Sequence, residues 1–210
     1  MTGNEMLSTL GLRLEDPEES SFTQTAKLDA LNIAQKSVVN LVHNAYLSEL
    51  QVIQLNVAMT ANALAFSGLT SVPIRNGIVA IKDNGNKWAT MIDPGDQKRL
   101  ENSYLASSGT NPIAYVFAES IYCEGPGATD GIDVWYLKAP TDIAADTTEC
   151  ELNVSLHESV VDFAENQLWK MDAKPDRAAA AYSNGTAQIT SLNARYSSEA
   201  PSGIGTKNRA

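Results

Sequence analysis

The spacing of apolar residues changes twice along the 210 residues of this chain, and these changes limit the possible fold classes. Over residues 23–50, apolar residues recur every three or four positions with no glycine or proline among them, which predicts one long helix. Helical spacing returns over residues 152–171 and 176–196, which are separated by a break at 172–175. We therefore predict an α+β fold: a helical bundle formed by the N- and C-terminal helices, with a central antiparallel β insertion.

The β region is marked by turn-forming residues. Residues 78–82 and 87–92 flank Asn84 and Gly85, and an Asn-Gly pair between two apolar runs strongly predicts a hairpin. A second hairpin is expected from residues 113–118 and 121–124, joined across Glu119 and Ser120, and a last strand from residues 132–137.

Two neighbouring stretches need separate interpretation. Residues 51–67 alternate with a period of two, which favours strands with a turn near residues 60–62. Their many alanines leave a continuation of the preceding helix open. After the first hairpin, Asp93 and Pro94 are typical of an N-cap and a first helical residue, so we expect a short helix ending near Leu105.

These patterns divide the chain into three parts. Residues 1–49 and 141–197 are expected to form a discontinuous helical domain, and residues 50–140 a β-rich insertion domain. Residues 198–210 are rich in serine, glycine, proline and charge, so we expect an extended C-terminal tail.

The charge balance disfavours a conventional nucleic-acid binder. The chain has 15 basic and 25 acidic residues, a formal net charge of −10, without the clustered lysines and arginines that displace counterions from phosphate. No charged leader precedes an apolar stretch, and residues 50–69 are interrupted by polar side chains, so neither an export signal nor a membrane span is expected. Cys123 and Cys150 are therefore expected to be reduced thiols.

The sequence contains no arrangement typical of an active site. His157 and Glu158 begin like a zinc-protease motif, but Val161 stands where the second histidine would be needed. Neither a nucleophile elbow nor a glycine-rich phosphate loop occurs. We therefore expect no catalytic, cofactor or metal site, and hence no enzyme. Trp88 and Trp135 lie among alternating apolar residues and are expected to be at least half buried.

Motifs along nearly the whole chain resemble the head-to-tail adaptor proteins of short-tailed bacteriophages, also called head-completion or tail tubular proteins. The segments that carry the resemblance are Leu-Gly-Leu-Arg-Leu-Glu-Asp-Pro at 10–17, residues 27–35 and 41–47, Asn-Lys-Trp-Ala at 86–89, residues 92–94 and 111–116, Ile-Tyr at 121–122, Trp-Tyr-Leu-Lys-Ala-Pro at 135–140, Leu-His-Glu at 156–158, Phe-Ala-Glu-Asn-Gln-Leu-Trp at 163–169 and Arg-Ala at 177–178. Each motif is weak alone, but their order along the chain is that of the family.

The resemblance implies a structural virion protein without catalytic residues or cofactors. Twelve copies would form a ring, the head-tail connector, between the portal protein and the tail nozzle. This ring would line the DNA channel, stabilise the packaged head and take part in genome ejection and tail assembly. The expected partners are further copies of the chain, the portal, the nozzle and tail fibre proteins, with DNA passing non-specifically and no membrane. The expected location is the virion neck, after assembly in the host cytoplasm.

Candidate contact residues come from the helical spacing near the C-terminus. Over residues 176–196 apolar side chains keep a heptad-like spacing, and Ile204 is the one large apolar residue of the tail. The candidates for a portal or subunit interface are Tyr182, Ile189, Leu192, Tyr196 and Ile204. A different class of function stays open: a small-ligand or carbohydrate-binding β module flanked by helices, which exposed aromatic residues on the sheet would favour.

Overall fold

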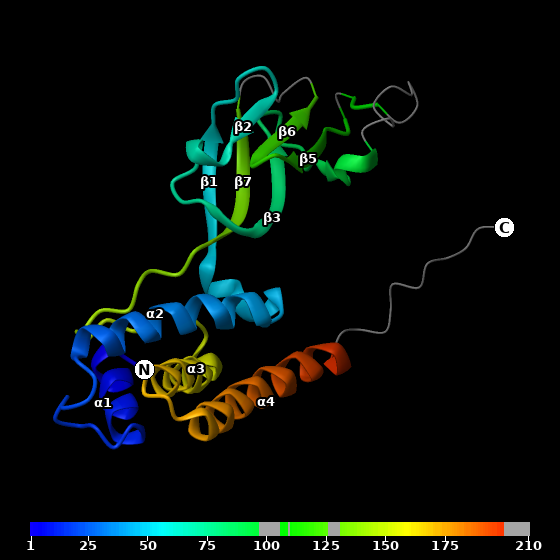
Figure 1. Ribbon diagram of the computed structural model, residues 1–210. Coiled ribbons are helices and arrows are strands. Elements are labelled where there is room, and N and C mark those ends of the chain that lie inside the picture. Colours follow the sequence, from blue (N-terminus) through cyan, green and yellow to red (C-terminus); the bar gives the residue numbers. More distant parts are fainter. Residues whose placement is uncertain (97–105, 109, 126–130, 200–210) are drawn as a thin grey trace. The chain divides into compact units, whose positions relative to one another are not determined.

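The computed structural model describes residues 1–96, 106–108, 110–125 and 131–199, without the side chains of Asn76 and of residues 196–199. The chain divides into two compact units (Figure 1). Met1–Glu49 and Pro140–Ala210 form the first, here called the helical unit, and Leu50–Ala139 form the second, the β unit. The prediction of a mixed α+β fold is confirmed.

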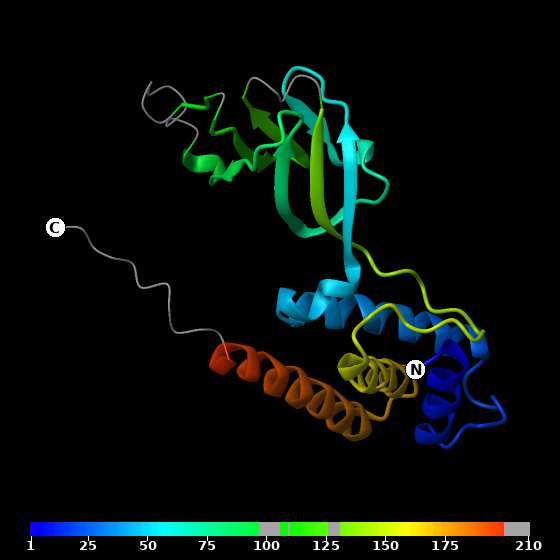
Figure 2. The ribbon, with the colours of Figure 1, turned by 180° about the vertical axis from the view of Figure 1, so that it is seen from behind.

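The helical unit contains four α-helices and two short 3-10 helices in its described residues. The α-helices are α1 (Gly3–Arg13), α2 (Gln24–Leu41), α3 (His157–Met171) and α4 (Pro175–Glu199), and the 3-10 helices are η1 (Asn44–Leu50) and η5 (Val154–Leu156). Helix α3 packs against α1, α2 and α4, and both views show it between α2 and α4 (Figure 2). Its buried face supplies much of the core of this unit, because Val160, Val161, Ala164, Leu168 and Trp169 all point inward.

Helix α2 starts as expected but ends nine residues early. The Thr23 hydroxyl accepts a hydrogen bond from the Ala26 N–H, a typical N-cap. The predicted helix over 23–50 is wrong beyond Leu41, because Val42 is extended and buried. Asn193 of α4 supplies hydrogen-bond partners at this end: its Nδ2 donates to the Leu41 carbonyl (3.1 Å) and its Oδ1 accepts from the His43 N–H (2.9 Å). The end of α2 is thus fixed by a residue far away in the sequence.

The two helices predicted near the C-terminus are both present, but the predicted start of the first one is wrong. Helix α3 starts at His157 rather than near residue 152, after the 3-10 turn η5. The expected break between the helices is present: Ala173 has a positive φ of 53°, and the Lys174 N–H donates to the Trp169 carbonyl. Helix α4 then begins at Pro175, a residue suited to the first turn of a helix.

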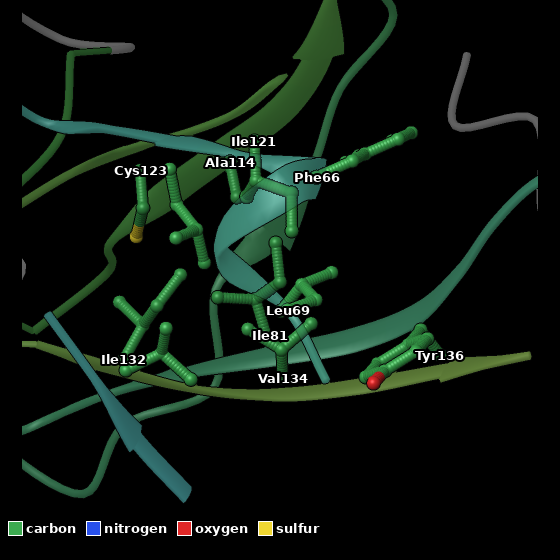
Figure 3. Close-up of a cluster of buried hydrophobic side chains, with 11 residues drawn as sticks. Phe66, Leu69, Ile81, Ala114, Ile121, Cys123, Ile132, Val134 and Tyr136 are labelled. Atoms are coloured by element: carbon green, nitrogen blue, oxygen red, sulfur yellow. The ribbon is translucent and has the colours of Figure 1, made fainter. Parts of the chain in front are cut away.

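The β unit consists of two small sheets. The first sheet has the order β1 (Gln51–Val57), β7 (Ile132–Lys138) and β3 (Pro73–Asp83), all antiparallel. The second has the order β2 (Ala63–Ala65), β6 (Ser120–Glu124), β5 (Ile113–Phe117) and β4 (Thr90–Met91). Side chains between the sheets form the core: Ile132, Val134 and Tyr136 of β7 face Ala114, Ile121 and Cys123 (Figure 3). The 3-10 turn η2 (Phe66–Gly68) adds Phe66 to this core.

Strands rather than a helix occupy most of residues 51–67, as the period of two predicted. The turn also lies where it was expected, since Ala61 and Asn62 both have positive φ and Thr60 bridges to Ala63. The two strands do not pair with each other over their length, however. Strand β1 pairs with β7 and β2 pairs with β6, so this segment crosses from one sheet to the other.

The hairpin prediction at Asn84 and Gly85 is only half right. The turn forms and Lys82 bridges to Trp88, but β4 then leaves β3 and pairs in parallel with β5. The expectation of an entirely antiparallel β region is therefore wrong at β4. The second hairpin, β5–β6, is confirmed, with its turn one residue earlier at Ala118 and Glu119.

The helix expected over residues 93–105 lies partly outside the described residues. Residues 94–96 form a helical turn, and the Asp93 carboxylate accepts a hydrogen bond from the Gly95 N–H at 2.8 Å, as an N-cap does. Residues 97–105 are not among the described residues.

Candidate interaction surfaces

Helix α4 has one buried side and one open side. Ala178, Ala181 and Ile189 are buried, and α4 packs on α3. At this contact a Cβ added to Gly185 would lie 3.0 Å from Cε2 of Phe163, so glycine permits the close approach. The open side carries mostly small or hydroxyl-bearing residues along a shallow groove, lined by Tyr182, Ser183, Thr186, Ala187, Thr190, Ser191 and Ala194. Such short side chains allow another helix to approach closely.

The predicted contact residues differ in how far they are exposed to solvent. Tyr182 is 49% exposed, contacts Phe163 edge to face at 5.5 Å between ring centroids, and lies 6.0 Å from the Lys170 ammonium. Leu192 is half-buried, and its carbonyl accepts a hydrogen bond from the Tyr46 hydroxyl. Ile189 is buried within the helical unit, so it holds α4 in place and offers no surface to a partner. The side chain of Tyr196 and all of Ile204 lie outside the described residues.

A second groove in the helical unit shares Tyr182 with the first. It lies among α2, α3 and α4 and is lined by Ser37, Asn40, Leu41, Phe163, Asn166, Gln167, Lys170 and Tyr182. Leu41 and, two turns earlier on α2, Ile33 are 47% and 53% exposed. This groove therefore combines apolar side chains with amide groups and one ammonium group. The sequence spacing made Tyr182 a candidate contact residue but gave no sign of the α2 residues, because they meet α4 only in the folded chain.

Helices α1, α3 and α4 are connected by a polar network. The Arg13 guanidinium contacts the Asp162 carboxylate, donates to Glu158 at 2.5 Å and lies 3.6 Å from Glu165. Gln188 of α4 donates to the other Asp162 oxygen at 3.0 Å. Burial raises the pKa of Asp162, and the contact with Arg13 opposes that shift. This network holds the three helices together and faces neither groove described above.

Both cysteine thiols and the His157 ring are buried in the described structure. Burial raises the pKa of the Cys123 thiol to about 11, and it also raises that of Cys150, whose Sγ donates to Gln35 Oε1 at 3.1 Å. Both groups therefore remain protonated and unreactive near neutral pH. His157 is buried between the Met1 amino group, 2.5 Å from its Nδ1, and the Leu152 carbonyl, 2.8 Å from its Nε2. Burial lowers its pKa, which fits a structural histidine.

The described residues offer neither a metal cluster nor a membrane helix. No group of three or more histidine, cysteine or acidic side chains among them is arranged to hold a metal ion. Within the same part of the chain, no helix combines the length and the apolar character that crossing a membrane requires.

The β unit presents an apolar surface that the sequence analysis missed. On the side of the first sheet opposite the core lie Ile53 of β1, Trp135 of β7 and Lys82 of β3, with Leu55 on the same side of β1. Trp88 adjoins them: its ring centroid is 4.7 Å from that of Trp135 and 5.7 Å from the Lys82 ammonium. We call this set the outer face, defined as Ile53, Leu55, Lys82, Trp88 and Trp135.

The expectation that both tryptophans are at least half buried is wrong for Trp88. It is 58% exposed, and Ile53 and Leu55 are 54% and 65% exposed. Alternation in the sequence indicates which residues share a side of a strand, but it does not indicate whether that side is covered. A contiguous exposed apolar patch of this kind is typical of an interaction site.

A comparison with protein-family models gives a match over nearly the whole chain. A family model described as SU10 adaptor protein matches residues 1–205, which span both units. No match was found among curated proteins.

Proposed function

Since the chain belongs to the SU10 adaptor protein family, we propose that it is a head-to-tail adaptor of a short-tailed bacteriophage, twelve copies of which form a ring between the portal and the tail nozzle. The observation that carries this proposal is the family match over residues 1–205, because it includes both the helices and the β unit. It agrees with the resemblance that the sequence motifs indicated. The proposed role is structural rather than catalytic.

The helical unit is the proposed site of ring and portal contacts. In this proposal its helices form the bundle and the β unit is an insertion between α2 and α3. The open side of α4 and the adjacent groove meet at Tyr182, where apolar, amide and ammonium groups lie together. Tyr182 and Leu192 would contact the portal or a neighbouring copy directly, and Tyr196 and Ile204 would extend that contact. Ile189 would contribute only by holding α4 against α3.

The distribution of charge supports a helical unit that lines the DNA channel. Of the 25 acidic and 15 basic residues, 17 acidic and 9 basic belong to the helical unit, a net charge of −8. The remaining 8 acidic and 6 basic residues give the β unit only −2. A ring of twelve acidic units would repel phosphate, so DNA could pass without sticking. In this proposal the protein resides in the virion neck, is assembled in the host cytoplasm and also contacts nozzle and tail fibre proteins.

Sedimentation of the purified chain, alone and mixed with portal rings from the same phage, tests this proposal. We expect about twelve chains to sediment with each ring, and Tyr182→Ala to weaken binding, with a loss of about tenfold typical of an interface anchor. Val154→Ala is the matched control, because Val154 is also an exposed apolar residue of the helical unit, 74% exposed, away from both grooves. A chain that remains monomeric and never binds portal would contradict the proposal.

A second candidate function is a carbohydrate-binding β module, and one observation favours it. Trp88 is 58% exposed and contacts the partly buried Trp135 at 4.7 Å between ring centroids, and sugars stack on exposed aromatic rings. Titration of tryptophan fluorescence with a panel of oligosaccharides tests it. Saturable quenching that Trp88→Ala abolishes would support this function, whereas an unchanged spectrum would remove it.

A further inference from the structure

We propose that the outer face of the first sheet docks on the α1–α2 turn of a second copy of this chain. By that turn we mean the exposed residues Leu12, Glu15, Glu18 and Glu19, called the acidic turn below. The proposed function does not say which surfaces of two copies meet, and this inference names them. It rests on the proposed function in one respect only, namely that the contacts between copies close into a ring.

The region around the outer face is positive, although the chain as a whole is acidic. Among the described residues of the β unit, the four cations all lie on the first sheet or in the turn that follows β3: Arg75, Lys82, Lys87 and Lys138. The same sheet carries two carboxylates, Asp83 and Asp133, which accept from the Lys87 and Asn56 N–H groups at 2.8 Å and keep their charge. The four cations less these two carboxylates leave the sheet and its turn with a net charge of +2 among the described residues. An apolar surface with this charge fits a partner surface that is both apolar and acidic.

The acidic turn has the complementary composition. Leu12 is 70% exposed, and the exposed Glu18 and Glu19 follow within seven residues, whereas Glu15 already lies 3.2 Å from Arg177 of its own chain. The segment is also held in one conformation, because the buried Asp16 carboxylate accepts hydrogen bonds from the Ser21 and Phe22 N–H groups (both 2.9 Å). Lys27, also buried, lies 3.3 Å from the same carboxylate. A preorganised surface loses little conformational entropy on binding.

The geometry of the sheet favours contact through its face rather than through an edge. Both edge strands have irregular register, β1 between Gln54 and Val57 and β3 between Pro73 and Ala80. Asn56 and Arg75 have positive φ at these positions, which interrupts the regular ladder that an added strand would need. A partner therefore meets the side chains of the outer face and does not extend the sheet.

The two surfaces are different, so a contact between copies would be heterologous. Each copy offers one outer face and one acidic turn, and head-to-tail contacts of this kind close into a ring when the rotation between copies allows it. An isologous dimer would pair outer face with outer face, which brings the Lys82 ammonium groups of two copies together and is disfavoured.

Cross-linking between differently labelled copies tests the contact. Gln51→Cys, on the same side of β1 as Ile53, and Ser8→Cys, one turn before Leu12 on α1, are both at exposed positions and leave the proposed contact residues intact. They are made in separate full-length chains, mixed, and treated with a short bismaleimide, both at high concentration alone and on portal rings. We expect a cross-linked dimer only in the mixture, with yield falling as salt is raised to about 0.5 M. Val154→Cys paired with Gln51→Cys is the control, because Val154 is exposed elsewhere on the helical unit, and it should cross-link at least about tenfold less.

Exchanging the charges of the two surfaces tests whether a loss of cross-linking comes from the contact itself and not from a change in the fold. Lys82→Glu alone, or Glu18→Lys with Glu19→Lys, should lower the cross-linking yield about tenfold, and combining the two changes in opposite chains should restore it. No cross-link in either condition would overturn the proposal, even if portal binding is intact. A single chain that carries both cysteines gives a further test. If it cross-links internally with the same yield after dilution, the proposal is also overturned, because the outer face then docks on the helical unit of the same chain. A cross-link without portal binding would count against the proposed function alone.

Discussion

The two units of this chain bury their apolar side chains in different arrangements. In the helical unit, α3 lies among three other helices, and polar groups from distant segments connect them, such as Arg13 with Asp162. In the β unit, two small sheets share one core, and the side of the first sheet away from that core is open. The comparison indicates that the helical unit concentrates charge and long-range connections, whereas the β unit concentrates exposed apolar surface.

Removing a core side chain from each unit should give the largest effect. Leu168 and Ile81 are both fully buried, one in each unit. Leu168→Ala and Ile81→Ala should each lower the free energy of unfolding by about 2–5 kcal/mol, because both leave a cavity. Calorimetry combined with hydrogen exchange by segment should show that each change weakens its own unit. If either change lowered protection equally in both units, the division into two units would be contradicted.

Filling the close contact between α3 and α4 should have a smaller effect. Gly185→Val would place side-chain atoms against the Phe163 ring and should lower the free energy of unfolding by about 1–3 kcal/mol. Ala187→Val on the open side of α4 is the matched control and should change stability by less than about 1 kcal/mol. Chemical denaturation of the two variants measures the difference. Equal destabilisation would mean that the two sides of α4 are not distinct.

Replacing the exposed Trp88 should weaken the assembly of copies more than it lowers the stability of the chain. Because Trp88 is 58% exposed, Trp88→Ala should lower the free energy of unfolding by less than about 1.5 kcal/mol, the part due mainly to its contact with Trp135. Assembly of copies should weaken far more. Thermal denaturation and sedimentation of the same preparation measure both quantities. A large loss of stability with normal assembly would show that Trp88 is a core residue.

Acidification should lower the stability of the helical unit more than that of the β unit. Near neutral pH this is the smallest of the predicted effects. Hydrogen bonds from Ser21 and Phe22 hold the pKa of Asp16 well below its usual range, so its stabilising contribution is present above about pH 4 and is lost as pH falls further. Burial lowers the pKa of His157, so the unfolded state binds the proton more readily and stability also falls as pH drops below about 6.5. Asp162, with a raised pKa, acts in the opposite direction.

Melting curves from pH 7 to pH 3 measure this dependence. We expect the helical unit to lose stability first, and Asp16→Asn to reduce its dependence below about pH 4. In the described part of the β unit, burial raises the pKa of the Tyr115 hydroxyl and of the Cys123 thiol, and both groups stay neutral over this pH range. If the β unit melted first on acidification, this part of the comparison would be wrong.

Local patterns predicted the type of most elements, and distant contacts explain where the prediction failed. The amphipathic spacing of α2, α3 and α4 and the period of two in β1 are properties of short segments, so they could be read from the sequence. The end of α2 depends on Asn193, and the parallel pairing of β4 depends on β5, so neither has a local signal. The outer face was missed for the same reason, because exposure of Trp88 depends on which elements cover the sheet.

Hydrogen–deuterium exchange of the full chain, free and bound to portal rings, tests the central claim most directly. The claim is that the helical unit, through α4 and its adjacent groove, makes the contacts of an adaptor. The account predicts new protection on binding in residues 182–194 of α4 and in residues 33–41 of α2, with little change in the core strand β7. Protection confined to the β unit, or binding without any protection of α4, would contradict it.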